Sequence, residues 1–260
     1  MPIKIMIAIQ KGGCGKSTTT SVIAEILATS GYKVLVIDLD SQGNATQMLT
    51  QKSIYEFSGN TVLEALKAFD PNPYIYGVKE NLYLIPAEDE LATFSRWLYA
   101  NERATAPEDI LHSLIENLDE DYDFVLMDCP PNIGDIVINA TRCADYIFIP
   151  VQPEPFAMDA LDRFIRFIKG AQESGYTNAQ IIGIVYTMID GRSATQKAIM
   201  QAIKSNYKNS VFSSEVRLRA KIKDYALLGV QMERKSDMQA LEDYIKVTEE
   251  LISRVKEQNK

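Results

Sequence analysis

The segment between Gln10 and Thr18 limits the possible folds of this chain more than any other part of the sequence. It is rich in glycine, and it joins an apolar run at residues 3–9 to a stretch with helical apolar spacing at residues 18–29. Glycines allow successive backbone N–H groups to surround an anion. A helix that begins there points the positive end of its dipole at the same anion. We therefore expect a strand, a phosphate-binding loop and a helix in this order.

This loop fits the pattern G-x-x-G-K-[ST] with a short lead-in. Lys16 is expected to neutralise the β- and γ-phosphates of a nucleoside triphosphate, and the Ser17 hydroxyl is expected to ligate Mg²⁺. The alternative is a glycine-rich hairpin with solvated lysines, and the strand–loop–helix context argues against it. The residues expected to contact the nucleotide here are Gly12, Gly13, Cys14, Gly15, Lys16, Ser17 and Thr18.

Short apolar runs alternate with helical patterns along the whole sequence. Strands that are buried on both faces of a parallel sheet have this composition. The alternation predicts a doubly wound α/β fold, with a mostly parallel sheet and helices on both faces, in a single domain of residues 1–260. We expect strands at residues 3–9, 34–37, 82–85, 124–127, 146–149 and 181–186. We expect helices at residues 18–29, 63–69, 89–101, 107–118, 136–143, 158–174, 195–207 and 238–256.

Acidic residues follow two of the expected strands. Asp38 and Asp40 come at the end of the second strand, where ligands bind in open α/β sheets. Asp128 ends the apolar run at residues 124–127, which is the Walker B arrangement that holds Mg²⁺, usually through a water. Residues 38–44 could also form an ordinary turn rich in Asp, Asn and Gly. The phosphate-binding loop upstream favours the catalytic interpretation.

A second lysine, Lys11, stands at the head of the loop, where an ordinary phosphate-binding loop does not require one. The run Lys11-Gly-Gly-x-Gly-Lys16-Ser17 resembles the deviant Walker A loop of the ParA/MinD family. Residues 38–46 are similar to that family's D-x-D-P-Q-G-N-A-T, with Ser41 in place of the proline. Residues 128–134 are similar to its D-x-P-P-x-x-G. The chain thus resembles a ParA-type partition ATPase over nearly its whole length.

The resemblance implies a Mg²⁺-dependent ATPase that acts as a homodimer with ATP held between the subunits. In the family the leading lysine reaches the nucleotide of the other subunit, which gives Lys11 a catalytic role beside Lys16. Asp40 would orient the attacking water, and Asp38 would support the metal and the loop. The residues expected at the metal are Ser17, Asp38 and Asp128.

The resemblance also implies partners. The ATP-bound dimer would bind non-specific double-stranded DNA, and a ParB-like centromere-binding protein would stimulate hydrolysis and release. The expected location is the cytoplasm, with association with the nucleoid in the ATP-bound state.

Positive charge is concentrated in one part of an otherwise acidic chain. Residues 192–235 hold ten Lys and Arg against three acidic residues, whereas the whole chain has a formal net charge of −8. Such asymmetry indicates a polyanion-binding face. Residues 187–192 resemble the family's T-M-x-D-x-R, and residues 215–218 resemble its N-V-R-L, both linked to DNA binding. The residues expected to contact DNA are Arg192, Arg217, Arg219, Lys221 and Lys223.

In residues 217–223, which we call the basic segment, cations alternate with apolar residues. An extended backbone would place its four cations on one face. No aromatic residue is interleaved, so we expect sequence-independent contact with phosphates. The alternative is an ordinary solvated surface with scattered cations.

Two other functions share the nucleotide motifs. A MinD-like membrane-associated ATPase would need an amphipathic C-terminal anchor. The tail after Lys246 has Val247, Leu251 and Val255 at helical spacing, but it has no aromatic residue and its charges nearly balance. We expect this helix to pack on its own domain, without stable membrane association. A metabolic enzyme, such as a nitrogenase iron protein or dethiobiotin synthetase, is less compatible with the cysteine positions or with Lys11.

The three cysteines, Cys14, Cys129 and Cys143, have no paired spacing, which is typical of a reduced cytosolic protein. Cys14 and Cys129 both fall in the expected nucleotide loops. Redox sensitivity is therefore one interpretation, and a small buried apolar residue is the other.

Overall fold

The computed structural model describes residues 1–100 and 106–258 of the chain. Within these residues, seven strands form one sheet in the order β3-β4-β2-β5-β1-β6-β7. Every neighbouring pair is parallel except β3 and β4. The strands are β1 (Ile3–Ile7), β2 (Val34–Asp38), β3 (Tyr76–Lys79), β4 (Leu82–Ile85), β5 (Phe124–Asp128), β6 (Tyr146–Val151) and β7 (Gln180–Tyr186).

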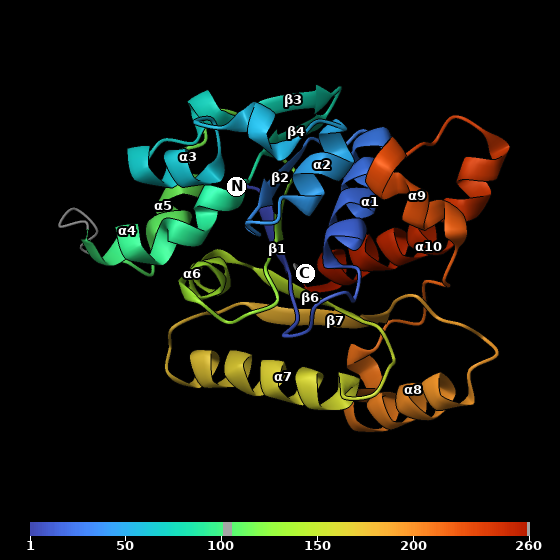
Figure 1. Cartoon of the computed structure of the whole chain (residues 1–260). Coiled ribbons are helices and arrows are strands. Elements are labelled where there is room, and N and C mark those ends of the chain that lie inside the picture. The colour runs from blue at the N-terminus through green and yellow to red at the C-terminus, as the bar shows by residue number, and fades with distance from the viewer. Residues whose placement is uncertain (101–105, 259–260) are drawn as a thin grey trace.

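Helices connect and flank the strands (Figure 1). None of the helices in the described ranges is both long enough and apolar enough to span a membrane. The α-helices are α1 (Lys16–Thr29), α2 (Asn44–Thr50), α3 (Val62–Ala68), α4 (Phe94–Ala100), α5 (Ile110–Glu116), α6 (Asp135–Cys143), α7 (Ala157–Glu173), α8 (Ala194–Tyr207), α9 (Ala220–Leu228) and α10 (Lys235–Gln258).

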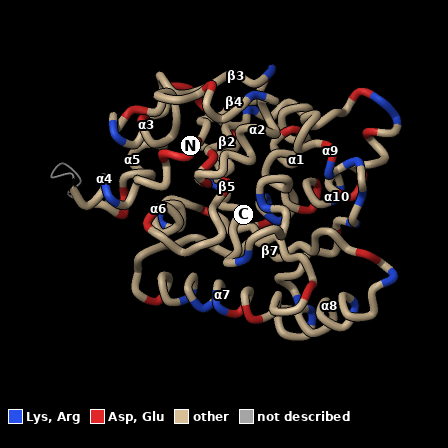
Figure 2. The backbone as a smooth tube through the Cα atoms, viewed as in Figure 1, with Lys and Arg blue, Asp and Glu red and all other residues tan. Residues whose placement is uncertain are grey.

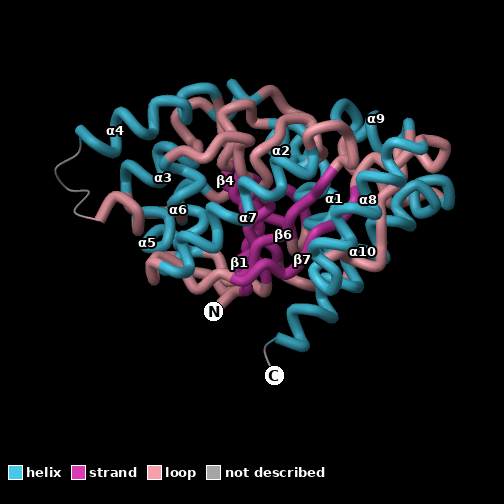
Figure 3. The backbone as a smooth tube through the Cα atoms, turned by 90° about the horizontal axis from the view of Figure 1, so that it is seen from below, coloured by secondary structure: helices cyan, strands magenta, loops and turns pink. Residues whose placement is uncertain are grey.

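The side chains of each strand alternate between two hydrophobic cores, as the pleat of a strand requires. Met6 of β1 belongs to the core formed with α3 to α8, whereas Ile5 and Ile7 belong to the core formed with α1, α2, α9 and α10. Helices therefore cover both faces of the sheet, and Figure 3 shows the strands surrounded by helices. The predicted doubly wound, mostly parallel α/β fold is confirmed.

The six predicted strands are all present, with ends that differ by a few residues. Three short elements, β3, α2 and α9, were not predicted. With four and seven residues, β3 and α2 give little periodic signal. The helix predicted at residues 89–101 is a short 3₁₀ turn, η3 (Asp89–Thr93), followed by α4. Asn101 lies outside the described residues.

The extended face predicted for the basic segment is wrong, because the backbone enters α9 at Ala220. Arg219 is the last extended residue, with φ of −128° and ψ of 132°. Ile222 and Tyr225 then pack against the core that contains α1 and α10, and their spacing of three residues is helical. Residues two apart in a helix do not share a face, so the four cations do not form one row.

The carboxyl ends of three neighbouring strands meet at one edge of the sheet. The register pairs Ile7 of β1 with Asp128 of β5, and Asp128 with Asp38 of β2. The loops that leave these strands are therefore brought together, which is where open α/β sheets bind ligands.

Candidate active site

The phosphate-binding loop between β1 and α1 has the backbone that its glycines permit. Gly13 and Gly15 have φ of 72° and 83°, a region that other residues rarely adopt. A β-carbon at Gly15 would also lie 2.9 Å from Cε of Met188. The Thr187 hydroxyl donates to the Cys14 carbonyl oxygen over 2.9 Å, so the residues that follow β7 hold the loop.

The two lysines of the loop have different surroundings, and only Lys16 lines the cleft. The ammonium group of Lys16 donates to the carbonyl oxygen of Lys11 over 3.0 Å, and Lys16 is only 7% exposed. Nζ of Lys11 is buried, makes no hydrogen bond to the described residues, and lies 3.7 Å from Oε2 of Glu154. Two buried ammonium groups beside positive-φ glycines fit a phosphate ligand. Contact between Lys11 and another subunit remains a prediction.

Asp128 lies at the end of β5, and one of its two carboxylate oxygens accepts no hydrogen bond from the described residues. Oδ1 accepts a hydrogen bond from Thr20 Oγ1 over 3.0 Å, whereas Oδ2 is buried without a hydrogen-bond partner among the described residues. An orphaned carboxylate oxygen beside Ser17 fits the oxygen-rich coordination that Mg²⁺ prefers. Among the described residues, no group of three or more His, Cys, Asp or Glu side chains could hold a metal. Ser17 and Asp128 supply at most two ligands, so water or ligand oxygens would fill the other positions around Mg²⁺.

Asp38 organises the loop that follows β2. Its Oδ2 accepts from the backbone N–H and the hydroxyl of Thr46, over 2.9 and 2.7 Å, and its Oδ1 accepts from the Asp40 N–H over 3.2 Å. These bonds fix the first turn of α2 and leave Asp40 at the edge of the cleft. The structure thus gives Asp38 a loop-supporting position, and its role at the metal remains a prediction.

Asp38 and Asp128 lie side by side on neighbouring strands and are both fully buried. Burial, together with the charge of Asp128, raises the pKa of Asp38. Burial also raises the pKa of Asp128, which the hydroxyls of Ser17 and Thr20 and the charge of Lys16 offset only in part. Two carboxyl groups whose ionised forms are penalised would gain from a nearby cation, which supports a metal site here.

The loops surround a cleft of about 710 Å³. Its lining includes Lys16, Ser17 and Asp40 from the predicted set, and also residues of α2 and α9 that were not predicted. Leu227 of α9 borders the cleft with 84% of its surface exposed. The sequence signal for α9 was available, because Tyr225 and Leu228 are three residues apart and Gly229 follows as a helix stop.

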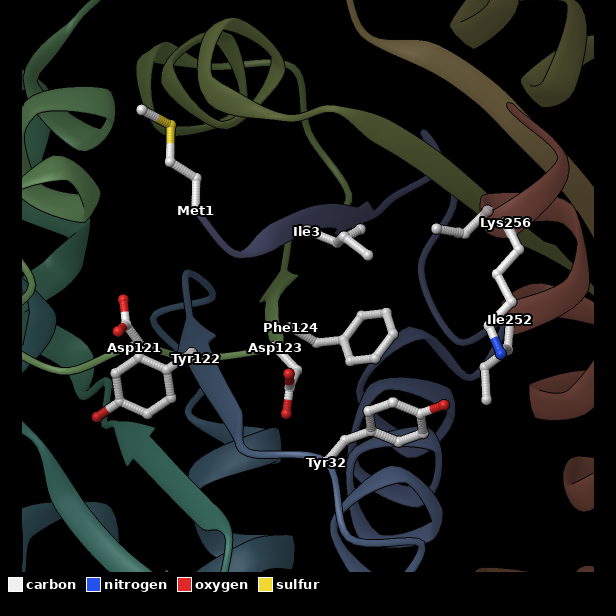
Figure 4. Close-up of a pocket in the computed structure, with 10 residues that line it drawn as sticks. Met1, Ile3, Tyr32, Asp121, Tyr122, Asp123, Phe124, Ile252 and Lys256 are labelled. Atoms are coloured by element: carbon white, nitrogen blue, oxygen red, sulfur yellow. The ribbon is translucent and has the colours of Figure 1, made fainter. Parts of the chain in front are cut away.

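A separate hollow of about 450 Å³ lies at the opposite, amino end of the strands (Figure 4). Ile3, Tyr32 and Phe124 form its apolar part, and the rings of Tyr32 and Phe124 meet edge to face at 5.3 Å. Asp121 and Asp123 line the same hollow. Lys256 lines it as well, but the loop at residues 10–18 does not border it, so this hollow is separate from the cleft described above.

Cys14 and Cys129 are fully buried. Burial raises the pKa of both thiols. The charge of the nearby Lys16 lowers both values but does not offset the effect of burial. Since the thiolate is the reactive form, these contacts favour the small apolar role over the redox role.

Four of the five predicted DNA-binding cations have acidic partners within the chain. Arg192 pairs with Asp190, Arg217 and Arg219 pair with Asp243, and Lys221 pairs with Asp237. Lys223 is exposed, with no ion pair to the described residues. Figure 2 shows Lys and Arg positions gathered around α9 and the start of α10.

Comparisons with known proteins show which family the chain resembles. A family model described as an AAA domain matches residues 3–183. The sporulation initiation inhibitor protein Soj of Bacillus subtilis is 30% identical over 82% of this chain and 83% of its own length. The chromosome-partitioning ATPase Soj of Thermus thermophilus is 28% identical over 98% of this chain and 97% of its own length.

A solved structure from Borrelia burgdorferi B31, bound to AMPPNP, is similar to the whole fold. It has a TM-score of 0.80 and 26% identity, and the match covers 99% of this chain and 100% of the other. The sheet, its order and the loops at its carboxyl edge therefore belong to a known architecture.

Proposed function

The chain belongs to the AAA-domain family of ParA- and Soj-type partition ATPases, and from this premise we propose that it is an ATP-driven switch for DNA segregation. The proposed reaction is the Mg²⁺-dependent hydrolysis of ATP to ADP and phosphate. The observation that carries the proposal is that Lys16, Ser17 and Asp40 line one cleft, although they follow two separate strands. Asp128, at the end of a third strand, is buried beside Ser17.

The residues of the cleft have separable tasks in this proposal. The loop backbone and Lys16 bind the phosphates and spread their charge. Ser17 and Asp128 hold Mg²⁺, which supplies charge neutralisation at the phosphates when bound. Asp40, at the edge of the cleft, positions the attacking water. Asp38 keeps Asp40 in place through the turn that begins α2.

Dimerisation would complete the site. Within the described residues, the buried ammonium group of Lys11 makes no hydrogen bond and lies 3.7 Å from one carboxylate, that of Glu154. We propose that in the ATP-bound homodimer this lysine leaves Glu154 and contacts the nucleotide of the other subunit. The exposed Leu227 at the mouth of the cleft is compatible with a surface that a second subunit covers.

The DNA-binding part of the proposal rests on the cations of residues 192–235. The dimer would present Arg192, Arg217, Arg219, Lys221 and Lys223 to the phosphates of non-specific double-stranded DNA. A ParB-like partner would stimulate hydrolysis and end the bound state. The protein would then be cytoplasmic, and associated with the nucleoid while ATP is bound.

A MinD-like membrane ATPase is the second candidate, because it would use the same cleft. The contacts of α10 disfavour it, since Leu241, Val247, Leu251 and Val255 are all buried in the core of the chain. A helix that packs its apolar face internally has none left for a membrane.

One experiment separates the two candidates. Retention on non-specific DNA and on anionic liposomes is measured with ATP and with ADP. Retention on DNA with ATP only supports the partition proposal, whereas retention on liposomes with ATP only contradicts it. Arg217→Glu combined with Arg219→Glu should remove DNA retention and leave ATP-dependent dimerisation in place.

A further inference from the structure

The helix α10 carries a row of acidic residues that faces residues 213–221. Asp243 and Glu250 are seven residues apart and lie on one side of the helix, whereas Asp237, six residues before Asp243, lies about a third of a turn away. All three contact the facing stretch. Glu250 accepts hydrogen bonds from two serines at the start of the facing stretch, and Asp237 pairs with Lys221 near its end. The path of this stretch is therefore set by carboxylates of α10.

Asp243, in the middle of the row, binds both arginines of the basic segment. Its Oδ1 is 2.6 Å from Nη2 of Arg217, and its Oδ2 is 3.2 Å from Nε of the same guanidinium. The Nε and Nη2 atoms of Arg219 both donate to Oδ2 over 3.3 Å. Only 4% of the Asp243 side chain is exposed, compared with 55% for Arg217 and 27% for Arg219.

Asp243 binds the Nε and Nη2 edge of each guanidinium, which is the edge that would otherwise bind an anion. The Nε and Nη2 donors form a fork that matches two oxygens of a carboxylate or a phosphate. A DNA phosphate must therefore compete with Asp243 for this fork. Burial acts to raise the pKa of Asp243, but the hydrogen bonds and charges of the two arginines outweigh it and lower the pKa. The competitor is thus a permanent anion at neutral pH.

Arg192 shows the opposite situation. Its fork also binds a carboxylate, that of Asp190, but 91% of the Arg192 side chain is exposed. A solvated pair of this kind is weak, and a phosphate can replace the carboxylate readily. The pairs at Asp243, whose carboxylate is buried, are the ones that can keep arginines from binding phosphates.

The surroundings of Asp243 also touch the nucleotide site. Arg217, Leu218 and Arg219 share a small hollow with Thr18 and Met188, which border the ATP cleft. Tyr244, the next residue of α10, has its hydroxyl 3.2 Å from Oγ1 of Thr19 in α1. A change at the phosphate-binding loop therefore has a direct path to the arginine pairs.

We infer that Asp243 keeps DNA binding low in the nucleotide-free protein by occupying the phosphate-binding edges of Arg217 and Arg219. The inference rests on the proposed DNA-binding function. In this scheme ATP binding loosens the contacts around Asp243, and the two guanidinium groups turn to DNA phosphates. Asp243 is a positioning residue, which acts through the arginines without touching DNA.

The test compares Asp243→Asn with Glu242→Gln in the full chain without nucleotide. Both changes remove one negative charge from adjacent positions of α10, but Glu242 is half exposed and pairs with Lys246. Affinity for a short DNA duplex of arbitrary sequence is measured at several salt concentrations. We expect D243N to bind several-fold more tightly at low salt, with a slope of log K against log[salt] steeper by about one to two. We expect E242Q to behave as the wild type.

The outcomes separate this inference from the proposed function. Equal binding by D243N and E242Q overturns the inference, provided that the wild type binds DNA with ATP. No binding by any variant with or without ATP overturns the proposed DNA function as well. A gain in D243N without ATP-dependent binding by the wild type supports the restraint by Asp243 and contradicts the ATP switch.

A second measurement covers the case in which D243N does not fold. Arg217→Gln combined with Arg219→Gln should leave DNA binding unchanged without nucleotide, because the arginines are already engaged. The same double variant should lose the binding that ATP induces. An equal loss in both states would show that the arginines contact DNA throughout, which overturns the inference.

Discussion

Buried carboxylates occur in two regions of this molecule, and their electrostatic states are opposite. At the carboxyl edge of the sheet, burial raises the pKa of Asp38 and Asp128, and one oxygen of Asp128 has no hydrogen-bond partner among the described residues. Along α10, the donors of the facing stretch lower the pKa of Asp243 and Glu250 despite their burial. In the first region, the charge of Lys16 offsets the raised pKa of Asp128 only in part. In the second region, Asp243 and Glu250 form ion pairs with arginines of the chain.

This difference indicates what each region is for. A carboxylate that is left short of cations costs stability in the empty protein, and it gains when a cationic ligand arrives. A carboxylate that is already paired stabilises the fold and resists exchange. Changes in the cleft should therefore affect ligand chemistry most, and changes along α10 should affect stability most.

The largest expected effect is that of Lys16→Ala. It removes the cation that the cleft places at the phosphates, so ATP turnover should fall by about 100-fold or more. Phosphate release measures it. Lys223→Ala is a matched control, because Lys223 is exposed and has no ion pair to the described residues. Unchanged hydrolysis in K16A would remove the cleft from its proposed role.

Asp40→Ala should separate binding from chemistry. Nucleotide affinity should persist, because Lys16 and the loop remain, while turnover falls by about 100-fold since the attacking water is no longer positioned. The neighbouring Ser41→Ala serves as the control, since it alters the same loop without removing a carboxylate. Chromatography with ATP should then show a persistent dimer. Normal ATP hydrolysis by this variant would exclude Asp40 as the residue that positions the attacking water.

The contrast between the two regions also explains what the sequence could predict. The strands and the loops at residues 8–15, 38–46 and 128–134 were predictable, because local periodicity and closely spaced motifs specify them. The pairing of Arg217 with Asp243 was not, since it joins residues 26 positions apart through a fold that the sequence only outlines.

The error at α9 has a local cause. Alternation of Lys221, Ile222 and Lys223 is typical of a strand, but the burial of Tyr225 three residues after Ile222 decides for a helix. Tertiary packing overrode a pattern of only a few residues.

Asp128→Asn tests whether the buried carboxylate of Asp128 destabilises the protein when no cation is bound. Because the folded pKa of Asp128, about 6, lies above the ordinary aspartate value of 3.8, the folded state binds more protons than the unfolded state between the two values. Stability due to this group therefore falls as pH rises from about 4 to about 6. At neutral pH, D128N should raise the stability of the nucleotide-free protein by about 1–3 kcal/mol.

The same variant should lose the stabilisation that Mg²⁺ and ATP give together. Thermal unfolding with and without Mg²⁺-ATP measures both effects. Asp145→Asn is a suitable control, because Asp145 precedes β6 at the other end of the sheet and is partly exposed. A D128N protein that is less stable without nucleotide would mean that Asp128 is a structural anion like those of α10.

Glu250→Gln makes the opposite prediction, a loss of stability, and should have the smallest effect on ATP turnover, which it should leave unchanged. Its carboxylate accepts bonds from Ser213 and Ser214 and pairs with Arg254 over 2.8 Å, and these contacts lower its pKa to about 2. The stabilisation is fully present above the unfolded value of 4.5 and is lost as pH falls through about 2. E250Q should therefore lose about 2–3 kcal/mol at neutral pH. The difference from wild type should shrink steadily below pH 4.5.

Denaturant unfolding at several pH values measures this loss, with the exposed neighbour Glu249→Gln as the control. A difference that does not change with pH would mean that Glu250 acts through packing alone, and the electrostatic contrast between the two regions would then fail at this residue.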